Sequence, residues 1–362
     1  MKAHQSEAEA PQVHDPAMKS LLAGNDTRFG VQIAASKPLM AWQATEMITN
    51  FCPKIRVVDL NCGCPIDLIF QSGGGSALLA APAKLRRVLQ GMSAVSGETP
   101  ISVKLRMGVA DSKPVADKII NKLLERPENG LHHLGGSTGV AAITLHGRSR
   151  QQRYTKAADW SYIASCSALI KQYHRQDAEV RDTVREVDDR QLPSRREPYF
   201  IGNGDVYSHV DYQEHIEKAG VDSVMIARGA LVKPWIFEEV VTGQYLDKSA
   251  NERLDYIRTF AHNGLAYWGT DTMGLQNTRR FLLEWLSFAY RYVPIGLLER
   301  LPPRLQDRPP RFCGRNELET LMASPDSRDW IKISEMVLGP CDEGFDFKPK
   351  HKSNSYEGEA EG

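Results

Sequence analysis

The chain has 362 residues, and its 45 basic and 45 acidic side chains cancel to a formal net charge of zero at pH 7. A hydrophobic content of 41% is enough to build the cores of one large domain and a smaller one. No run approaches the roughly 18 apolar residues of a membrane-spanning helix, and residues 1–27 lack the apolar core of a signal peptide. We therefore expect a soluble protein outside the usual secretory route. Its balanced net charge argues neither for nor against a nucleic-acid partner.

Cysteine usage points to a reducing compartment. Two of the six cysteines, Cys62 and Cys64, are separated by one residue, which is not the spacing of a disulfide framework. We therefore expect a cytoplasmic or nuclear protein. His132 and His133 are adjacent, but neighbouring residues rarely bind one ion together and no cluster of cysteines or carboxylates accompanies them. We expect no metal site.

In chain order, residues 1–28 come first; they are polar, and we expect them to form a flexible lead. Six short runs rich in β-branched residues follow, most of them separated by stretches of helical length. This alternation favours a parallel sheet with right-handed crossovers, and we expect a TIM (β/α)8-type α/β barrel over residues 29–243. Such a barrel has eight strands. Because the sequence shows only six runs, we expect the barrel to lack its first one to two strands. The runs are 29–34, 55–60, 101–106, 140–146, 198–203 and 223–228.

Two segments interrupt this alternation. Residues 126–139 are rich in glycine, and residues 174–197 carry dense charge of both signs, so we expect surface insertions, the second a solvated helix or a disordered loop. From residue 244 to 345 the pattern becomes all-helical, and a polar tail follows at 346–362. The 3.6-residue spacing of apolar side chains predicts helices at 252–268, 272–292, 315–323 and 327–338.

The helical region carries an aromatic stripe and a basic tract. Phe281, Trp285, Phe288 and Tyr292 share one helical face, which is typical of a core. The basic tract either is a solvated surface or, with Arg148, Arg150, Arg153 and Lys156, grips a phosphodiester backbone. Its members are Arg279, Arg280, Arg291, Arg300, Arg304, Arg308, Arg311 and Arg315.

A thiol stands where the second predicted strand ends. Gly63 and Pro65 break regular structure on both sides of Cys64, and glycines 73–75 lead into a helix predicted from about Ser76 to Val95. Side chains that follow strand ends form the active sites of α/β barrels. Taken alone, Cys64 is more typical of an inert buried cysteine than of a reactive one, but the neighbouring motifs favour the reactive one.

Residues after the other strands suggest a phosphate-bearing cofactor. The loops after the last two strands of a barrel commonly hold phosphate through backbone N–H groups, and here they contain Asn203-Gly204-Asp205 and Ala227-Arg228-Gly229. Lys104 lies among apolar neighbours and needs a negative partner, such as a reduced flavin, unless it reaches solvent. His146 and Gln32 add hydrogen-bonding groups, although each alone is more typical of a structural role.

Together these motifs resemble the tRNA-dihydrouridine synthases. Within that family the similarity is greatest to the third eukaryotic class, which reduces a uridine of the variable loop, and it covers about residues 28–352 apart from the two insertions. The motifs are VQ (31–32), NCGCPIDLIFQSGGGSALL (61–79), ISVKLRMG (101–108), ITLHGRSRQQRYTKAADW (143–160), IGNGDV (201–206), VMIARGAL (224–231), TRRFLLEWLSFAYRYVPIGLLERLP (278–302), ETLMAS (319–324), DWIKISEMVLGP (329–340) and PKHK (349–352).

The resemblance implies a flavin-dependent oxidoreductase that acts on tRNA. NADPH or NADH would reduce FMN, the flavin N5 would give a hydride to C6 of uracil, and Cys64 would protonate C5 as the general acid. The helical domain would bind the tRNA, and we expect a monomer with no membrane or metal partner. The residues that the resemblance assigns to FMN are Gln32, Lys104, His146, Asn203, Gly204, Asp205, Ala227 and Arg228.

The sequence also departs from the family. It lacks the first barrel strand, the beginning of the second with its early flavin-contacting segment, and the zinc-finger elements of this eukaryotic class. We expect an N-terminally truncated member in which FMN binding is weakened, because an open barrel leaves unpaired strand edges. Three functions remain: a dihydrouridine synthase, a catalytically impaired form that only binds tRNA, and another FMN-dependent oxidoreductase with a small-molecule substrate.

Overall fold

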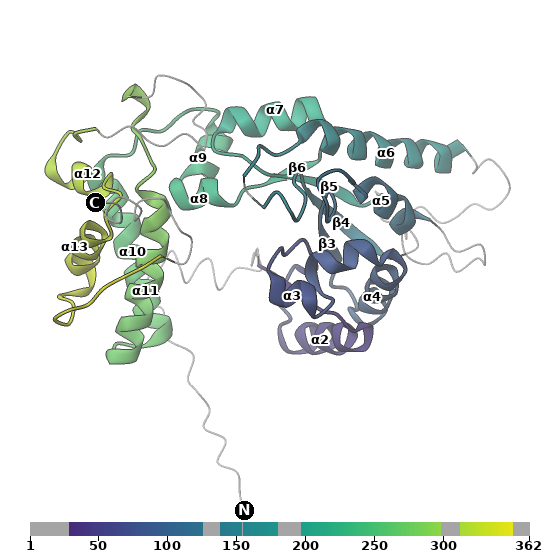
Figure 1. The fold of residues 1–362 in the computed structure, drawn as a ribbon, viewed down its shortest axis with the longest axis horizontal. Coiled ribbons are helices and arrows are strands. Elements are labelled where there is room, and N and C mark those ends of the chain that lie inside the picture. The colour runs from purple at the N-terminus through teal and green to yellow at the C-terminus, as the bar shows by residue number, and fades with distance from the viewer. Residues whose placement is uncertain (1–28, 126–137, 154, 180–196, 298–311, 350–362) are drawn as a thin grey trace, which may run out of the picture. The chain divides into compact units, whose positions relative to one another are not determined.

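The structure is a computed structural model that describes residues 29–125, 138–153, 155–179, 197–297 and 312–349. These residues form two compact units, which we describe separately (Figure 1). The sheet unit contains the described residues up to Val206 together with Asp211–Ile226. The helical unit contains Tyr207–Val210 and the described residues from Ala227 onward. The division thus falls earlier in the chain than the expected domain boundary at residue 244.

The sheet unit is built on a single parallel sheet in which every strand pairs with its neighbour in sequence. A sheet that never doubles back has the winding of a (β/α)8 barrel and differs from an open doubly wound sheet. The predicted α/β class with six parallel strands is confirmed. The strands are β1 (Gly30–Ile33), β2 (Val57–Cys62), β3 (Ile101–Arg106), β4 (Val140–His146), β5 (Tyr199–Asn203) and β6 (Ser223–Met225).

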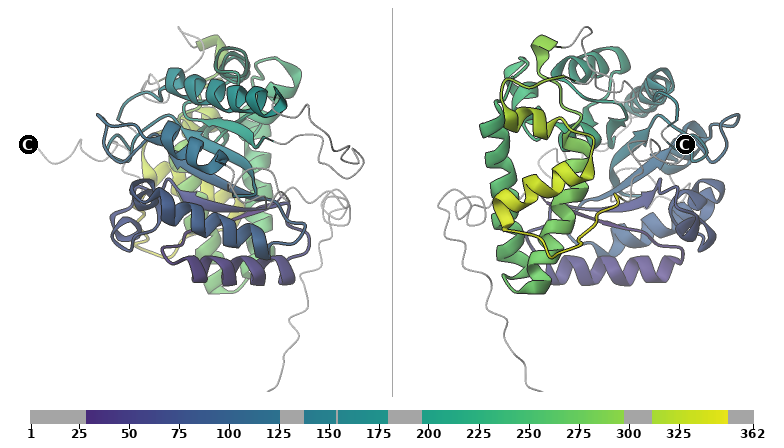
Figure 2. Two further views of the ribbon diagram at one scale, coloured as in Figure 1. Left: turned by 90° about the vertical axis from the view of Figure 1, so that its right-hand side faces the viewer. Right: turned by 60° about the vertical axis from the view of Figure 1, so that its left-hand side comes forward.

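Helices alternate with these strands (Figure 2). The segment between β2 and β3 differs from the single helix predicted from Ser76, because it forms a 3-10 turn and then an α-helix that begins at Pro82. Proline suits a first helical position, where no N–H is needed, but it breaks a helix interior. The elements are α2 (Pro38–Phe51), α3 (Asp67–Gln71), η1 (Gly75–Ala80), α4 (Pro82–Val95), α5 (Ala116–Leu124), α6 (Trp160–Glu179) and α7 (His209–Ala219).

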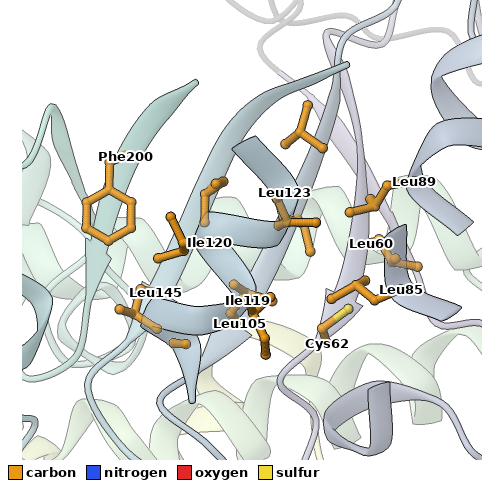
Figure 3. Close-up of a cluster of buried hydrophobic side chains, with 14 of the residues drawn as sticks. Leu60, Cys62, Leu85, Leu89, Leu105, Ile119, Ile120, Leu123, Leu145 and Phe200 are labelled. Atoms are coloured by element: carbon orange, nitrogen blue, oxygen red, sulfur yellow. The ribbon is translucent and has the colours of Figure 1, made fainter. Parts of the chain in front are cut away.

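One face of the sheet packs against the helices and forms the core (Figure 3). Leu60 and Cys62 of β2 lie in the same fully buried cluster as Leu85 and Leu89 of α4. Because side chains alternate along a strand, the residues between these apolar positions face the opposite side of the sheet. The sequence places polar and charged side chains at those alternate positions.

Side chains cap the first turns of four helices in the helical unit. Ser249 and Glu252 form a reciprocal capping box, and the side chains of Asp271, Asn316 and Asp326 each accept a backbone N–H at the start of a helix. The elements are α8 (Arg228–Val232), α9 (Ile236–Thr242), α10 (Ala250–Trp268), α11 (Thr272–Ala289), η3 (Ile295–Leu297), α12 (Glu317–Met322) and α13 (Ser327–Leu338).

The core of the helical unit corrects the interpretation of the aromatic stripe. Leu282, Leu283 and Leu286 form the buried face of α11, whereas Phe281 is 46% exposed. Tyr292 is buried but lies beyond the end of α11 at Ala289. Phe281, Trp285 and Phe288 instead line a cavity of about 700 Å³ with residues of α8 and α10. The apolar leucines therefore take the core face, and the rings lie beside it.

The basic tract is also divided by the structure. Arg279 is 4% exposed and donates to Ser334 Oγ and the Gly339 carbonyl, so it is a structural residue and does not belong to a surface. Arg315 is bonded to Asp247 and Glu319. Arg280 is exposed. Arg300, Arg304, Arg308 and Arg311 lie outside the described residues.

Several other expectations fall on residues that the structure does not describe. These are the lead at 1–28, His132 and His133, most of both insertions, and the end of the polar tail; the first residues of the charged insertion continue α6. Within the described part of the chain, no helix is long and apolar enough to cross a bilayer. No group of three metal-ligating side chains occurs among those same residues.

Candidate active site

Four of the predicted cofactor residues lie on the face of the sheet opposite the helices. Gln32 pairs in register with Asp59, Lys104 pairs with Asn61 and Thr144, and His146 pairs with Asn203. Each stands at a position that alternates with the buried apolar residues of its strand. The register therefore places Gln32 nearest the amino end of the strands. Lys104 lies two residues closer to the carboxyl end, and His146 and Asn203 lie at that end.

A hydrogen-bonded network occupies the lower part of this polar face. Gln32 Nε2 donates to Asp59 Oδ2 at 2.7 Å, and Ser102 Oγ donates to Asp59 Oδ1 at 2.6 Å. Asn61 Nδ2 donates to Gln32 Oε1 at 2.8 Å. Two side chains of β2 thus orient Gln32: its amide nitrogen donates to Asp59, and its amide oxygen accepts from Asn61.

Burial and neighbouring groups shift the pKa values of two side chains on this face. Burial raises the pKa of Asp59, although hydrogen bonds from Ser102 and Gln32 oppose the change. Burial and the nearby Arg106 guanidinium lower the pKa of Lys104 to about 8, although the Asp59 carboxylate opposes this. Because Lys104 is easier to deprotonate than an ordinary lysine, an anion bound beside it would restore its charge.

The loop that carries Cys64 is held at every peptide group around that residue. Asn61 Oδ1 accepts the N–H groups of Gly63 and Cys64 at 3.0 and 2.8 Å. Arg106 Nε donates to the Gly63 carbonyl at 2.7 Å, and Ser76 Oγ donates to the Cys64 carbonyl at 2.8 Å. Asn61 is the residue next to last in β2, so the strand itself sets the path of the loop.

Cys62 and Cys64 have different environments although one residue separates them. Cys62 is the last residue of β2 and is fully buried under the helices, where burial raises the pKa of its thiol well above the ordinary value. Cys64 lies beyond the strand and is partly exposed. Only Cys64 of this pair therefore combines solvent access with a position at the carboxyl edge of the sheet.

A chain of contacts runs from His146 through Arg148 to Asp205. Arg148 Nη1 lies 3.3 Å from His146 Nε2, and Arg148 Nη2 donates to both carboxylate oxygens of Asp205 at 2.6 and 2.7 Å. Asp205 Oδ2 also accepts the Ala158 N–H at 2.7 Å. The sequence left open whether Arg148 is a solvated surface cation or a contact to a phosphodiester backbone; the structure supports neither for this residue, because its side chain is 1% exposed.

The turn after β5 brings the backbone close to the His146 ring. Gly204 has a φ of +127°, and a Cβ there would lie 2.5 Å from Ala158 Cβ and 3.2 Å from His146 Cδ2. Asp205 follows with a φ of +53°. Asn203 Nδ2 donates to the Met225 carbonyl at 2.8 Å and so ties this turn to β6. Glycine is required at 204 for both conformation and space.

The two remaining predicted residues follow β6. β6 ends at Met225, Ala227 is the N-cap of α8, and Arg228 is its first residue. Both belong to the helical unit. They stay predictions as cofactor contacts.

The residue-by-residue prediction missed Asp59, Ser102 and Arg106, which orient Gln32 and the Cys64 loop. Their signal is present in the sequence, because each is a polar side chain that alternates with buried apolar residues within a strand. A polar residue at alternate positions of a barrel strand faces the side away from the helices. Reading the alternation inside the strands, and not only the residues after them, would have found them.

Sequence comparison identifies the family to which this architecture belongs. The profile of the dihydrouridine synthase (Dus) family matches residues 8–172 and 179–281. The chain belongs to the dihydrouridine synthase family. The match begins within the segment expected to be a flexible lead, so the dihydrouridine synthase similarity extends further toward the N-terminus than its motifs indicate. It confirms the family expected from the motifs.

Curated relatives give the same result over the whole chain. The tRNA-dihydrouridine(47) synthase [NAD(P)(+)] of Botryotinia fuckeliana is 59% identical over 367 residues, covering 100% of this chain and 49% of the relative. The proteins of the same name from Sclerotinia sclerotiorum and Coccidioides immitis are 58% and 60% identical, with 49% and 50% of their lengths covered. This dihydrouridine synthase chain spans about half the length of the curated relatives it matches.

Proposed function

We propose that this chain reduces a uridine of tRNA, in the variable loop, to 5,6-dihydrouridine with FMN and NADPH or NADH. The observation that carries the proposal is the position of Cys64, a partly exposed thiol on a rigid loop at the carboxyl edge of a sheet whose polar face bears Lys104 and His146. The names of the relatives support the substrate and the reductant, and the family supports the flavin.

The residues of the polar face fit a flavin mononucleotide. Lys104 supplies an ammonium group whose lowered pKa makes an anionic partner favourable. Gln32 and His146 supply groups that form directional hydrogen bonds, and Gly204 leaves space beside His146 that a Cβ would fill. We propose that the backbone N–H groups around Gly204 hold the phosphate.

Cys64 acts as the general acid in this proposal. The chemistry that FMN supplies when bound is transfer of a hydride, taken from NADPH or NADH, from its N5 atom to C6 of the uracil. Cys64 Sγ gives its proton to C5, which completes the addition of H₂ across the C5–C6 bond. The hydrogen bonds from Asn61 and Ser76 hold the loop still, so the thiol does not have to be reoriented at each turnover.

The substrate base has to leave its stack to reach this face of the sheet. Unstacking costs on the order of a few kcal/mol, which stacking and backbone contacts within the protein offset. We propose that exposed cations of both units, such as Arg280 of the helical unit and Lys156 of the sheet unit, contact the phosphates.

The experiment that tests the proposal is Cys64→Ala in the full chain, with FMN added and tRNA as substrate. We expect anaerobic reduction of the flavin by NADPH to be unchanged, while formation of dihydrouridine falls by about 10² to 10⁴-fold, the usual contribution of a general acid. Nucleoside mass spectrometry measures the product. Cys52→Ala is the matched control, because Cys52 is an exposed thiol at the end of α2. Equal turnover by the Cys64 variant would remove that thiol from the mechanism.

The same preparation separates the other two functions. A chain that retains no flavin but shifts tRNA in a gel, with an affinity that falls steeply as salt is raised, is only a tRNA-binding protein. A chain that reduces a free pyrimidine or an enone as well as it reduces tRNA is a small-molecule oxidoreductase. The proposal requires bound flavin together with dihydrouridine that forms only in tRNA.

A further inference from the structure

Arg148 is among the most deeply buried side chains of the sheet unit, and its guanidinium is held on three sides. Nη1 lies against His146 Nε2, Nη2 donates to both oxygens of Asp205, and Nε donates to the Lys156 carbonyl. All three guanidinium nitrogens therefore have a fixed partner. A planar group held in this way cannot turn away from the imidazole ring.

The contact between Arg148 and His146 determines where the imidazole proton lies. A guanidinium has only N–H donors and keeps its charge at all relevant pH values. The ring nitrogen 3.3 Å from Arg148 Nη1 must therefore accept, which makes Nε2 the bare nitrogen and puts the proton on Nδ1. A doubly protonated ring would set an N–H against an N–H and one cation against another.

The other groups around His146 favour the same state. Arg106 is its register partner on β3 and is a second buried cation, with 3% of its surface exposed. Asp205, after β5, contributes a carboxylate, and both of its oxygens accept N–H groups of Arg148. Gly204 packs its backbone against the ring edge. His146 itself is only 6% exposed, so solvent provides little stabilisation for an imidazolium.

We propose that Arg148, clamped by Asp205, is a positioning residue that keeps His146 uncharged with its proton on Nδ1. His146 then presents at Nδ1 a hydrogen-bond donor, which suits the acceptor atoms of a flavin, and adds no further cation beside Lys104 and Arg106. The identity of that flavin rests on the proposed function. The position of the proton rests on the protein's own atoms.

The test is histidine nitrogen NMR on the full chain without added cofactor. The protein is labelled with ¹⁵N-histidine, the signal of His146 is identified by its loss in His146→Gln, and long-range ¹H–¹⁵N spectra are recorded from pH 5 to 8. We expect a protonated Nδ1, a bare Nε2 and no titration in this range. A proton on Nε2, or titration near the ordinary histidine pKa of about 6.5, would overturn the inference.

Arg148→Gln tests the cause and Arg150→Gln is its control. Arg150 pairs with Asp67 and lies over the Phe70 ring, so its removal leaves His146 as it was. In Arg148→Gln we expect the ring to titrate within the range and FMN to bind about tenfold more weakly, the cost of about one hydrogen bond. An unchanged His146 spectrum in this variant would contradict the proposal.

The wild-type spectrum decides the inference even if Arg148→Gln does not fold. The wild-type spectrum also tests the inference independently of the proposed function. If the wild-type chain binds no FMN, the proposed activity fails, while the tautomer of His146 is still read directly from the spectrum.

Discussion

The charged residues Arg148 and Lys104 differ mainly in which neighbouring groups stabilise their positive charge. Arg148 is buried and its guanidinium is paired with the Asp205 carboxylate, whereas Lys104 is partly exposed, and Asp59 raises its pKa against the two effects that lower it, burial and the charge of Arg106. The first arrangement gives a permanent charge, and the second gives a group that is ready to change its protonation. A binding anion therefore affects Lys104 far more than it affects Arg148.

This difference predicts a pH dependence of FMN binding. The free protein loses the Lys104 proton near pH 8, whereas an anion beside Lys104 raises its pKa in the complex. Between these two values binding requires uptake of a proton, so affinity is greatest below pH 8 and falls by up to about tenfold per pH unit above it. Fluorescence titration of FMN from pH 7 to 9.5 measures the effect.

Lys104→Gln is the control for that profile. The variant has no proton to take up at this position, so its affinity should be weaker at pH 7 and should change little between pH 7 and 9.5. A wild-type affinity that is flat across this range would show that Lys104 does not meet the anionic part of the cofactor.

Packing between elements explains where regular structure departs from local propensity. Gly91 lies inside α4, a position where alanine is ordinarily favoured by about 1 kcal/mol. A Cβ at Gly91 would, however, lie 1.9 Å from Trp42 Cε2 of α2, and the Trp42 indole N–H donates to the Val88 carbonyl at 3.1 Å. The glycine is therefore a requirement of helix–helix packing.

Gly91→Ala tests this element contact. We expect it to lower the free energy of unfolding by about 1–3 kcal/mol, because the indole ring cannot move without losing its packing and its hydrogen bond. In a Trp42→Leu background the same substitution should be neutral or stabilising, since only helix propensity remains. Urea denaturation of the four proteins measures the coupling, and equal effects in both backgrounds would refute the contact.

Strands were easier to locate from the sequence than the segments that follow them. The runs at 101–106 and 140–146 match β3 and β4, because a strand buried on one face is encoded by its own apolar residues. The end of β2 was placed too early, at Leu60, because Asn61 is polar. Asn61 instead continues the strand and caps the loop, which depends on Gly63 and Cys64 folding back onto it.

At the level of the whole molecule, the chain buries two separate apolar clusters. One joins the sheet to its helices, and the other centres on the fully buried Trp330 with Leu282 and Leu283 of α11. The Trp330 indole N–H donates to the Ser324 carbonyl at 2.8 Å, so both its ring and its polar atom are satisfied inside the helical unit.

Trp330→Ala should therefore destabilise the helical unit in particular. The expected loss is about 3–5 kcal/mol, the usual cost of truncating a buried tryptophan. Hydrogen exchange followed by mass spectrometry should show faster exchange in α10, α11 and α13, with the amides of β2 to β4 unchanged. Equal acceleration in both clusters would mean that the two units unfold together.

The sequence by itself determined the family, the α/β alternation and the strand-end positions of Cys64, His146 and Asn203, because these depend on local pattern and motif. Only the tertiary structure decided which polar residues serve the backbone and which remain for chemistry. The sequence left open whether Arg148 lies on a surface, whereas in the structure Asp205, 57 residues away in the chain, holds it beside His146. Such a pairing satisfies a buried charge over a long sequence separation, and no local pattern records it.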